Sequence, residues 1–310
     1  MNLSPRLRFK LERFKAALRS TLAAKETNYD TSHRMCPNCR GLVSRDASVC
    51  PLCETPLRSP RARGGGGVPA GRVMGGLIPI PSTATSALVA ANIALYGVSW
   101  YLTQQTALPG SGGGGDIGDL VLLRLGAKVG WMIFAGHQWW RLVTAMFLHA
   151  GLLHIGMNLW CLFDLGPEVE SLFSTPKFVV LYLATGVFGF LVSLFWRPYG
   201  SSVGASGAIV GLIGILIGAS YHHGTLGQDY RRRLWFWVAY ILLFIFLPIP
   251  VDNAAHIGGL VSGLALGYFI PEGEPDTRAS ETLWNTLALV SVLIIAASFA
   301  MMALQLNAKY

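Results

Sequence analysis

The stretch "SSVGASGAIVGLIG", residues 201–214, decides the fold because it joins two properties that seldom occur together. It is apolar enough to enter a membrane, yet glycines recur along it, and each one costs a helix about 1 kcal/mol relative to alanine. Such a pattern is tolerated where a second helix must approach the backbone closely, or where a serine needs open backbone around it for chemistry. Ser206 lies in this stretch, so both explanations apply to it.

The whole chain has the composition of a membrane protein. Of its 310 residues, 52% are hydrophobic and only 13% are charged, whereas a soluble domain carries about 25% charged residues. A membrane span needs about 20 mostly apolar residues. Seven windows come close to this length, namely 84–103, 148–165, 176–196, 206–221, 234–250, 253–270 and 284–304. The prediction is an all-α polytopic membrane protein with seven spans.

The basic residues predict how these spans are oriented. Of the 24 Lys and Arg residues, 14 precede residue 81, and five more fall in alternate connections at 177, 231–233 and 278. Basic residues favour the cytoplasmic side, so we expect a cytoplasmic N-terminus and a C-terminus outside. The first residues lack the apolar core of a signal peptide, and we expect the plasma membrane. On this topology Ser206 and His256 lie at the same outer depth.

Polar side chains interrupt three of the windows in a pattern that suits nucleophilic chemistry. Ser206 opens the fourth window, and His256 lies about one turn into the sixth. A serine attacks only when a base accepts its proton, which neutral imidazole does near pH 7. His154 and Asn158 share a helix face in the second window, where they are candidate donors to an oxyanion. Glycines at 207, 211, 214 and 218 and at 259, 263 and 267 would let the fourth and sixth spans touch.

Other interpretations of these polar residues remain. A single serine or histidine in a span often bonds only to its own backbone or to another polar group, and glycine stripes often serve packing alone. A metal site built from His149, His154 and His256 would lack carboxylates and cysteines, and the first two do not share a face. A channel or transporter would spread polar residues through the whole depth, whereas these gather at one end.

A soluble front end precedes the spans. We expect residues 1–30 to form a basic amphipathic helix, which would lie either on the anionic membrane surface or against the next module. Residues 31–57 contain Cys36, Cys39, Cys50 and Cys53 as two CxxC pairs. Four thiolates at this spacing favour tetrahedral Zn²⁺, although iron would also fit and two disulfides are the alternative. Residues 58–80 read as a flexible linker, and 81–310 as the membrane domain.

The two CxxC pairs resemble the zinc-ribbon family, in which each first cysteine is often followed by proline, as in Pro37 and Pro51. So small a segment buries little core, and the metal would supply its folding energy. A docking or regulatory role with a cytoplasmic partner is expected for this module. Nothing in its sequence specifies nucleic-acid binding, and none is expected.

Five motifs in the membrane part resemble the rhomboid family of intramembrane serine proteases. They are "GASG" around Ser206, "AHIGGLVSG" around His256, "HAGLLHIGMN" with His149, His154 and Asn158, the "WWR" segment with Trp140 and Arg141, and "LGPEVE" with Gly166 and Glu170. The resemblance implies a six-helix bundle, here followed by one additional C-terminal span. It also implies transmembrane protein substrates within the lipid bilayer.

The resemblance further assigns roles to these residues. Ser206 would be the nucleophile and His256 its base, with no acid required. His154, Asn158 and the Ser206 amide would bind the oxyanion. Gly204 would let the backbone approach the substrate, and His149 would be structural. Arg141 and Glu170 would anchor the first outer loop, and Asp252 is interpreted as an ordinary loop residue.

One departure from the family pattern leaves a second hypothesis open. Many rhomboids carry a tyrosine four residues after the serine, where its ring supports the histidine, and this chain has Val210 there. The alternative is therefore a weakly active or inactive rhomboid-like protein that binds membrane clients. The retained Ser206 and His256 favour the protease.

Overall fold

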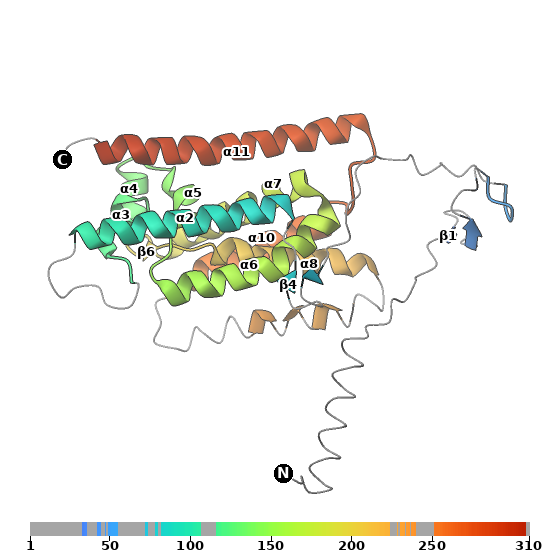
Figure 1. The fold of residues 1–310 in the computed structure, drawn as a ribbon, viewed down its shortest axis with the longest axis horizontal. Helices are drawn as coiled ribbons and strands as arrows, with labels where there is room; N and C mark the ends of the chain where they lie inside the picture. Colours follow the sequence, from blue (N-terminus) through green and yellow to red (C-terminus); the bar gives the residue numbers. More distant parts are fainter. Residues whose placement is uncertain are drawn as a thin grey trace, which may run out of the picture. The chain divides into compact units, whose positions relative to one another are not determined.

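A computed structural model describes residues 33–35, 42–44, 47, 49–54, 72–73, 78–79, 82–106, 116–223, 228, 230–232, 234–235, 237–239 and 251–307. The chain divides into two compact units, Met1–Ile78 and Pro79–Tyr310. The second unit holds nearly all of the described helices, which are drawn with their labels in Figure 1.

The first unit contains a short antiparallel hairpin of β1 (His33–Met35) and β2 (Leu42–Ser44). The predicted amphipathic helix over 1–30 lies outside the described residues, as do Cys36 and Cys39. Within the predicted linker, β3 (Arg72–Val73) and β4 (Ile78–Pro79) form a two-stranded sheet. The remainder of the linker also lies outside the described residues.

The second unit is built around α8 (Ser206–Ser220), the helix that begins with the glycine-rich stretch. Every residue of α8 after Ser206 is buried. Its neighbours are α6 (Leu152–Phe173), α7 (Thr175–Trp196) and α10 (Asn253–Phe269). A helix with apolar side chains on all sides is suited to such a central position, because other helices cover its whole circumference.

Two long helices lie at the periphery of this group. They are α2 (Thr83–Thr106), which contacts α6, and α11 (Arg278–Asn307), which contacts α7. Most of the less exposed residues of α11 recur at alternating steps of four and three: Trp284, Ala288, Ser291, Ile295, Ser298, Met302 and Gln305, with Phe299 beside them. This spacing gives a narrow seam along one side of a helix. Most of the α11 surface therefore faces away from the bundle.

The described residues include several helices that are long and apolar enough to cross a membrane. Four qualify singly: α2, α7, α8 extended by the 3-10 helix η2 (Tyr221–His223), and α11. A fifth arises if the segments 141–147 and 152–173, which meet at 91°, are counted as one broken span. The chain is thus an all-α membrane protein with multiple spans.

Comparison with the predicted windows gives one correction and two open cases, one of them the predicted span 253–270, because α10 has 17 residues and is not among the helices that qualify. The second window was expected to end at residue 165, but α6 continues to Phe173 with Pro167 inside it. The physical reason is that the far end of this helix is buried against α2, as Glu170 illustrates below. Most of the predicted span 234–250 lies outside the described residues.

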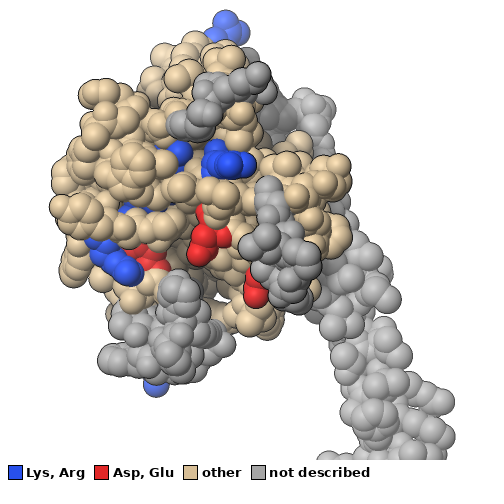
Figure 2. Space-filling model, turned by 90° about the vertical axis from the view of Figure 1, so that its left-hand side faces the viewer, with Lys and Arg blue, Asp and Glu red and all other residues tan. Residues whose placement is uncertain are grey.

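Short elements gather where α6, α8 and α10 begin, and this is called the Ser206 end. They are α3 (Asp119–Arg124), α4 (Gly130–Phe134), α5 (Arg141–Thr144), the 3-10 helix η1 (Ala145–Phe147), and the antiparallel strands β5 (Lys128–Val129) and β6 (Ser201–Ser202). They lie at the left of Figure 1. Figure 2 looks onto this end, where acidic and basic side chains are few and scattered among uncharged ones.

Candidate active site

The backbones of α8 and α10 touch without intervening side chains. A Cβ added at Gly259 would lie 2.0 Å from the carbonyl oxygen of Gly207, and one at Gly263 would lie 2.1 Å from that of Gly211. At the far end of the pair, a Cβ at Gly267 would lie 2.1 Å from the Ile215 carbonyl oxygen. Only glycine permits this approach along the whole seam, so the predicted role of the two glycine stripes in helix proximity is confirmed.

This contact brings Ser206 and His256 together across 50 residues of sequence. Ser206 is the first residue of α8, and His256 lies in the first turn of α10. The Ser206 Oγ and the His256 Nε2 are 2.8 Å apart, which is hydrogen-bond distance. The His256 side chain is buried, and its Nδ1 has no hydrogen-bond partner in the described part of the chain.

His154 lies on the other side of the serine, against Gly204. Gly204 has φ +128°, which side-chain-bearing residues rarely adopt, and a Cβ there would lie 2.8 Å from His154 Nε2. The Gly204 N–H donates to the Ala145 carbonyl oxygen at 2.8 Å, which ties this loop to η1. The His154 Nδ1 accepts the Ala150 N–H at 3.3 Å. A neutral imidazole that accepts at Nδ1 carries its proton on Nε2, so Nε2 is a donor beside Ser206.

Asn158 and His149 contact His154. The Asn158 Nδ2 donates to the His154 carbonyl oxygen at 2.8 Å, one turn earlier on α6. The His149 ring is fully buried and meets the edge of the His154 ring at a centroid distance of 5.1 Å. Both residues therefore fix the position of His154.

A second polar group at the Ser206 end joins α7, α10 and the β5–β6 strands. The Asp252 carboxylate caps α10 by accepting the Ala255 N–H at 3.1 Å, and it also accepts the Ser193 hydroxyl. Lys128 is fully buried, and its Nζ donates to two carbonyl oxygens at 3.2 Å, those of Arg197 and Gly200. Asp252 therefore lies outside the catalytic pair, as predicted, and in addition caps α10.

The charges of this group shift one another's ionisation. Burial lowers the pKa of Lys128, and the nearby Asp252 charge raises it in part. Burial alone would raise the pKa of Asp252, but hydrogen bonds from Ser193, Ser202 and the Ala255 amide, together with the Lys128 charge, hold that pKa below its ordinary value. The carboxylate is therefore ionised at neutral pH.

Arg141 organises the loop between α2 and α6. It is buried, its Nη1 donates to the carbonyl oxygens of Leu123 at 2.8 Å and Ala127 at 2.9 Å, and its Nε donates to Gln138 Oε1 at 2.5 Å. Its guanidinium also lies 4.8 Å from the centre of the Trp140 ring. The predicted anchoring of this loop by Arg141 is confirmed.

Glu170 does not anchor that loop, and this prediction was wrong. Its carboxylate lies near the opposite end of α6, where it accepts the N–H groups of Ala84 and Thr85 at 3.1 and 2.9 Å. The hydroxyls of Ser82, Thr85 and Thr175 also donate to it. The first amides of a helix have no partners inside the helix and carry partial positive charge. A buried carboxylate is stable at this position, where it joins the starts of α2 and α7 to α6.

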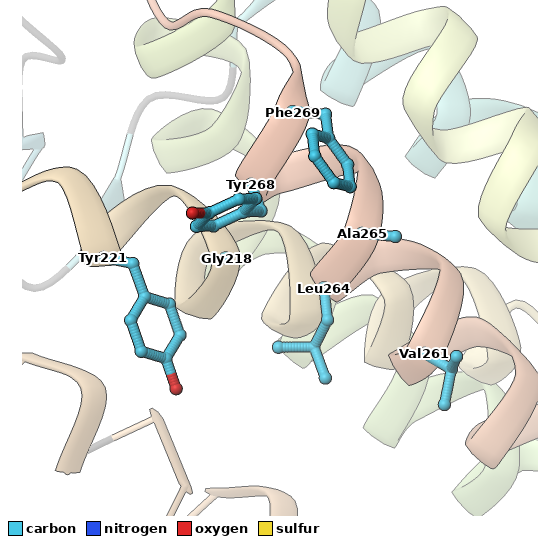
Figure 3. Close-up of a pocket in the computed structure, with 7 residues that line it drawn as sticks. All are labelled: Gly218, Tyr221, Val261, Leu264, Ala265, Tyr268 and Phe269. Atoms are coloured by element: carbon cyan, nitrogen blue, oxygen red, sulfur yellow. The ribbon is translucent and has the colours of Figure 1, made fainter.

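A hollow at the surface of the described residues is remote from Ser206. It measures about 460 Å³ and lies beside the far ends of α8 and α10, lined by Gly218, Tyr221, Val261, Leu264, Ala265, Tyr268 and Phe269 (Figure 3). Gly218 is 12 residues beyond Ser206 on α8, which is about 18 Å along the helix. The lining is almost wholly apolar and offers no reactive group.

The cysteines of the first unit are described only in part. Cys50 is fully buried, its Sγ accepts the Leu52 N–H at 3.4 Å, and Cys53 packs in the same small cluster. Two cysteines on one tight turn, one of them accepting a backbone N–H, fit half of a four-thiolate site. Cys36 and Cys39 lie outside the described residues, and the described residues alone contain no cluster that could hold a metal.

Comparison with known proteins now adds the family. A model of the Rhomboid domain matches residues 136–272. The putative rhomboid protease YdcA of Bacillus subtilis is 31% identical over 136 residues, which cover 43% of this chain and 68% of that protein. The chain belongs to the rhomboid family.

Other rhomboids match over a similar stretch. Rhomboid protease GluP of Bacillus subtilis is 34% identical over 154 residues, and RHOMBOID-like protein 6, mitochondrial, of Arabidopsis thaliana is 36% identical over 154 residues. Each match covers 48% of this chain, but only 29% of the bacterial protein and 49% of the plant protein. The chain thus spans less than half of the length of each of these two relatives.

Sequence reasoning missed Lys128 and the capping role of Asp252. A lysine in an otherwise apolar segment, "LGAKVGWMIF", was a possible signal, because a buried cation must find acceptors. The Ala145 carbonyl oxygen that holds Gly204 had no signal at all, since any residue supplies a carbonyl.

Proposed function

We propose that this rhomboid is an intramembrane serine endopeptidase in which Ser206 is the nucleophile and His256 the general base. The observation that carries the proposal is the 2.8 Å contact between Ser206 Oγ and His256 Nε2 on two helices whose backbones touch. A neutral imidazole at this distance removes the hydroxyl proton as the oxygen attacks a peptide carbonyl.

The proposed reaction has the acylation and deacylation steps of other serine hydrolases. Ser206 Oγ bonds to the carbonyl carbon, and its proton passes to His256 Nε2. The tetrahedral intermediate expels the amine, which takes that proton, and leaves an acyl ester on Ser206. Water, deprotonated by His256, attacks the ester and releases a carboxylate, and the proton returns to Ser206.

The oxyanion of each tetrahedral state would be stabilised by His154 and by the Ser206 amide. His154 Nε2 carries a proton and lies beside Gly204, next to the serine. The Ser206 amide is in the first turn of α8, where helix N–H groups lack intrahelical partners. Asn158, on the same face of α6, would be a further donor to the oxyanion, and His149 would hold the His154 ring.

Two observations favour a dyad over a triad and a protease over a channel. The Asp252 carboxylate is committed to Ala255 and Ser193, whereas His256 Nδ1 has no partner among the described residues.

Between Ser206 and Ser220, α8 carries no polar side chain, so the polar residues do not continue along the helix as a conduction path would require.

The proposed substrates are membrane proteins cut in or near a transmembrane segment. A helical amide is shielded by its own hydrogen bond, so a segment that unwinds easily and has small residues would be favoured. The basic residues further support a cytoplasmic N-terminus, an external C-terminus and the Ser206 end facing outside, in the plasma membrane.

We also propose that Cys36, Cys39, Cys50 and Cys53 bind one structural Zn²⁺. The metal would fix the first unit and take no part in hydrolysis, because thiolate ligands complete its shell. The unit would then be available to a cytoplasmic partner.

The function is tested with purified protein in liposomes, using a fluorophosphonate probe and a transmembrane reporter. Wild type should label and cleave, and Ser206→Ala and His256→Ala should do neither. Ser171→Ala and His222→Ala are matched controls on exposed sites away from Ser206 and should retain both activities.

A folded wild type that neither labels nor cleaves would refute the protease and favour the client-binding alternative. Val210, which is buried on α8 one turn after Ser206, is the residue to change first in that case. Restored labelling in Val210→Tyr would then attribute the lost activity to an unsupported His256.

A further inference from the structure

A buried lysine holds three chain segments together beside the active site. Lys128 lies in β5, which pairs with β6 through Lys128 and Ser202. Its Nζ donates to the carbonyl oxygens of Arg197, at the end of α7, and Gly200, which leads into β6. Its side chain is fully buried, so the ammonium depends on these acceptors in place of water. The cation therefore fixes the path of the chain shortly before Ser206.

A carboxylate holds the start of α10 to the end of α7. Asp252 accepts the Ser193 hydroxyl from α7. It also accepts the Ala255 N–H, and its own carbonyl oxygen accepts the His256 N–H at 3.2 Å. The first turn of α10, which carries His256, is thus tied to α7.

The two charged groups bind the same end of α7. Lys128 donates to the carbonyl oxygen of Arg197, and Asp252 accepts the hydroxyl of Ser193, four residues earlier on the chain. Each lies close enough to act on the other's charge. Neither touches Ser206 or the His256 ring in a described hydrogen bond, so their effect on the chemistry would pass through the backbone.

We propose that Lys128 and Asp252 form a positioning pair that sets the first turn of α10, and with it His256, against the segment that leads into Ser206. This inference rests on the proposed function of the two reacting residues. Glycine contacts bring the backbones of α8 and α10 together. The charged pair adds a restraint at the end where the reaction occurs.

The need for charge distinguishes this role from simple capping. Asparagine and aspartate cap helices about equally well. A helix that required only a cap would not need a carboxylate beside a buried lysine. Asp252→Asn therefore keeps the shape and the acceptor for Ala255 while removing the charge that Lys128 faces.

The test compares Asp252→Asn, Lys128→Met and the double variant with wild type, as full chains in liposomes. The readouts are the rate constant of fluorophosphonate labelling, kcat and KM for the transmembrane reporter, and the thermal midpoint. Asp119→Asn is the matched control, because Asp119 is an exposed carboxylate on α3 near the same end.

For Asp252→Asn we expect kcat and the labelling rate constant to fall about 10-fold with KM unchanged, because reaction rates depend steeply on sub-ångström placement of the reacting groups. The thermal midpoint should stay close to that of wild type. The double variant should be no slower than the slower single variant, since both residues act on the same end of α7. Asp119→Asn should match wild type in every readout.

Two results would overturn the positioning role alone. One is a labelled wild type whose Asp252→Asn variant labels at the same rate. The other is a loss of rate that follows a fall in the thermal midpoint, which would make the pair merely structural. A folded wild type that never labels would overturn the proposed function, and the positioning role with it.

Discussion

For the glycine contacts between α8 and α10, the effect of one substitution can be calculated as a displacement of the two helices. In Gly259→Ala, the new Cβ would lie 2.0 Å from the Gly207 carbonyl oxygen, whereas ordinary van der Waals contact begins at 3.4 Å. The atom it meets is backbone and has no rotamer to move. The helices must therefore separate locally by about 1.4 Å, the difference between these distances.

That displacement is large compared with the tolerance of the reaction. Gly207 follows Ser206 directly, and residue 259 lies three residues after His256. Adding about 1.4 Å to a 2.8 Å contact breaks the hydrogen bond between Ser206 and His256. Misplacement of reacting groups by about 1 Å costs on the order of 100-fold in rate. Overpacking should also lower the free energy of unfolding by about 1–3 kcal/mol.

The assay is fluorophosphonate labelling in liposomes together with the thermal midpoint. Gly267→Ala makes an equally close contact, 2.1 Å from the Ile215 carbonyl oxygen, but at the end remote from Ser206. It should destabilise the protein similarly and slow labelling far less. Gly156→Ala on α6 meets nothing within 4 Å and should be harmless. Equal labelling by Gly259→Ala and wild type would refute the reasoning, as would an equal loss in the 259 and 267 variants.

Three further predictions concern residues away from the seam. Glu170→Ala leaves several buried donors without an acceptor and should lower the free energy of unfolding by about 3 kcal/mol, measured by thermal or denaturant unfolding; an unchanged midpoint would contradict it. Cys50→Ser should abolish zinc binding in elemental analysis, whereas Cys161→Ser in α6 should leave the zinc content unchanged. Because the pKa of Asp252 is lowered in the folded state, the stabilisation of its ionised form should be present above about pH 4 and disappear as pH falls further; the thermal midpoints of wild type and Asp252→Asn, which are close at neutral pH, should therefore separate in acid as that of wild type falls.

The Ser206 end was predictable where its geometry follows from helix periodicity. Glycines at steps of three and four define one face of a helix, and two such faces can pack only on each other. The alternation of spans then placed Ser206 and His256 at one depth. Arg141 was placed correctly through its motif, because a lone arginine in an apolar loop must find acceptors among the backbone carbonyls nearby.

The contacts of other residues could not be predicted, because no sequence motif marks the groups that they bind. Glu170 binds amides and hydroxyls at the start of α2, about 85 residues earlier, and nothing in "LGPEVE" names that partner. The capping role of Asp252 was not predicted, because it depends on where α10 begins, and the sequence alone did not define that residue. The continuation of α6 through Pro167 likewise depends on tertiary packing that outweighs the local cost of proline.

The unequal lengths of the outer helices have a consequence for the surrounding lipid. Along α10, only 17 residues, about 25 Å, separate the two ends, and Ile257, Val261 and Phe269 are exposed on this flank. Along α11, 30 residues extend about 45 Å. A bilayer whose hydrocarbon core is about 30 Å thick cannot match the lengths of both α10 and α11. The protein should therefore sit in a membrane that thins beside α10 and either thickens beside α11 or tilts that helix, so that lipids around one molecule experience two different depths.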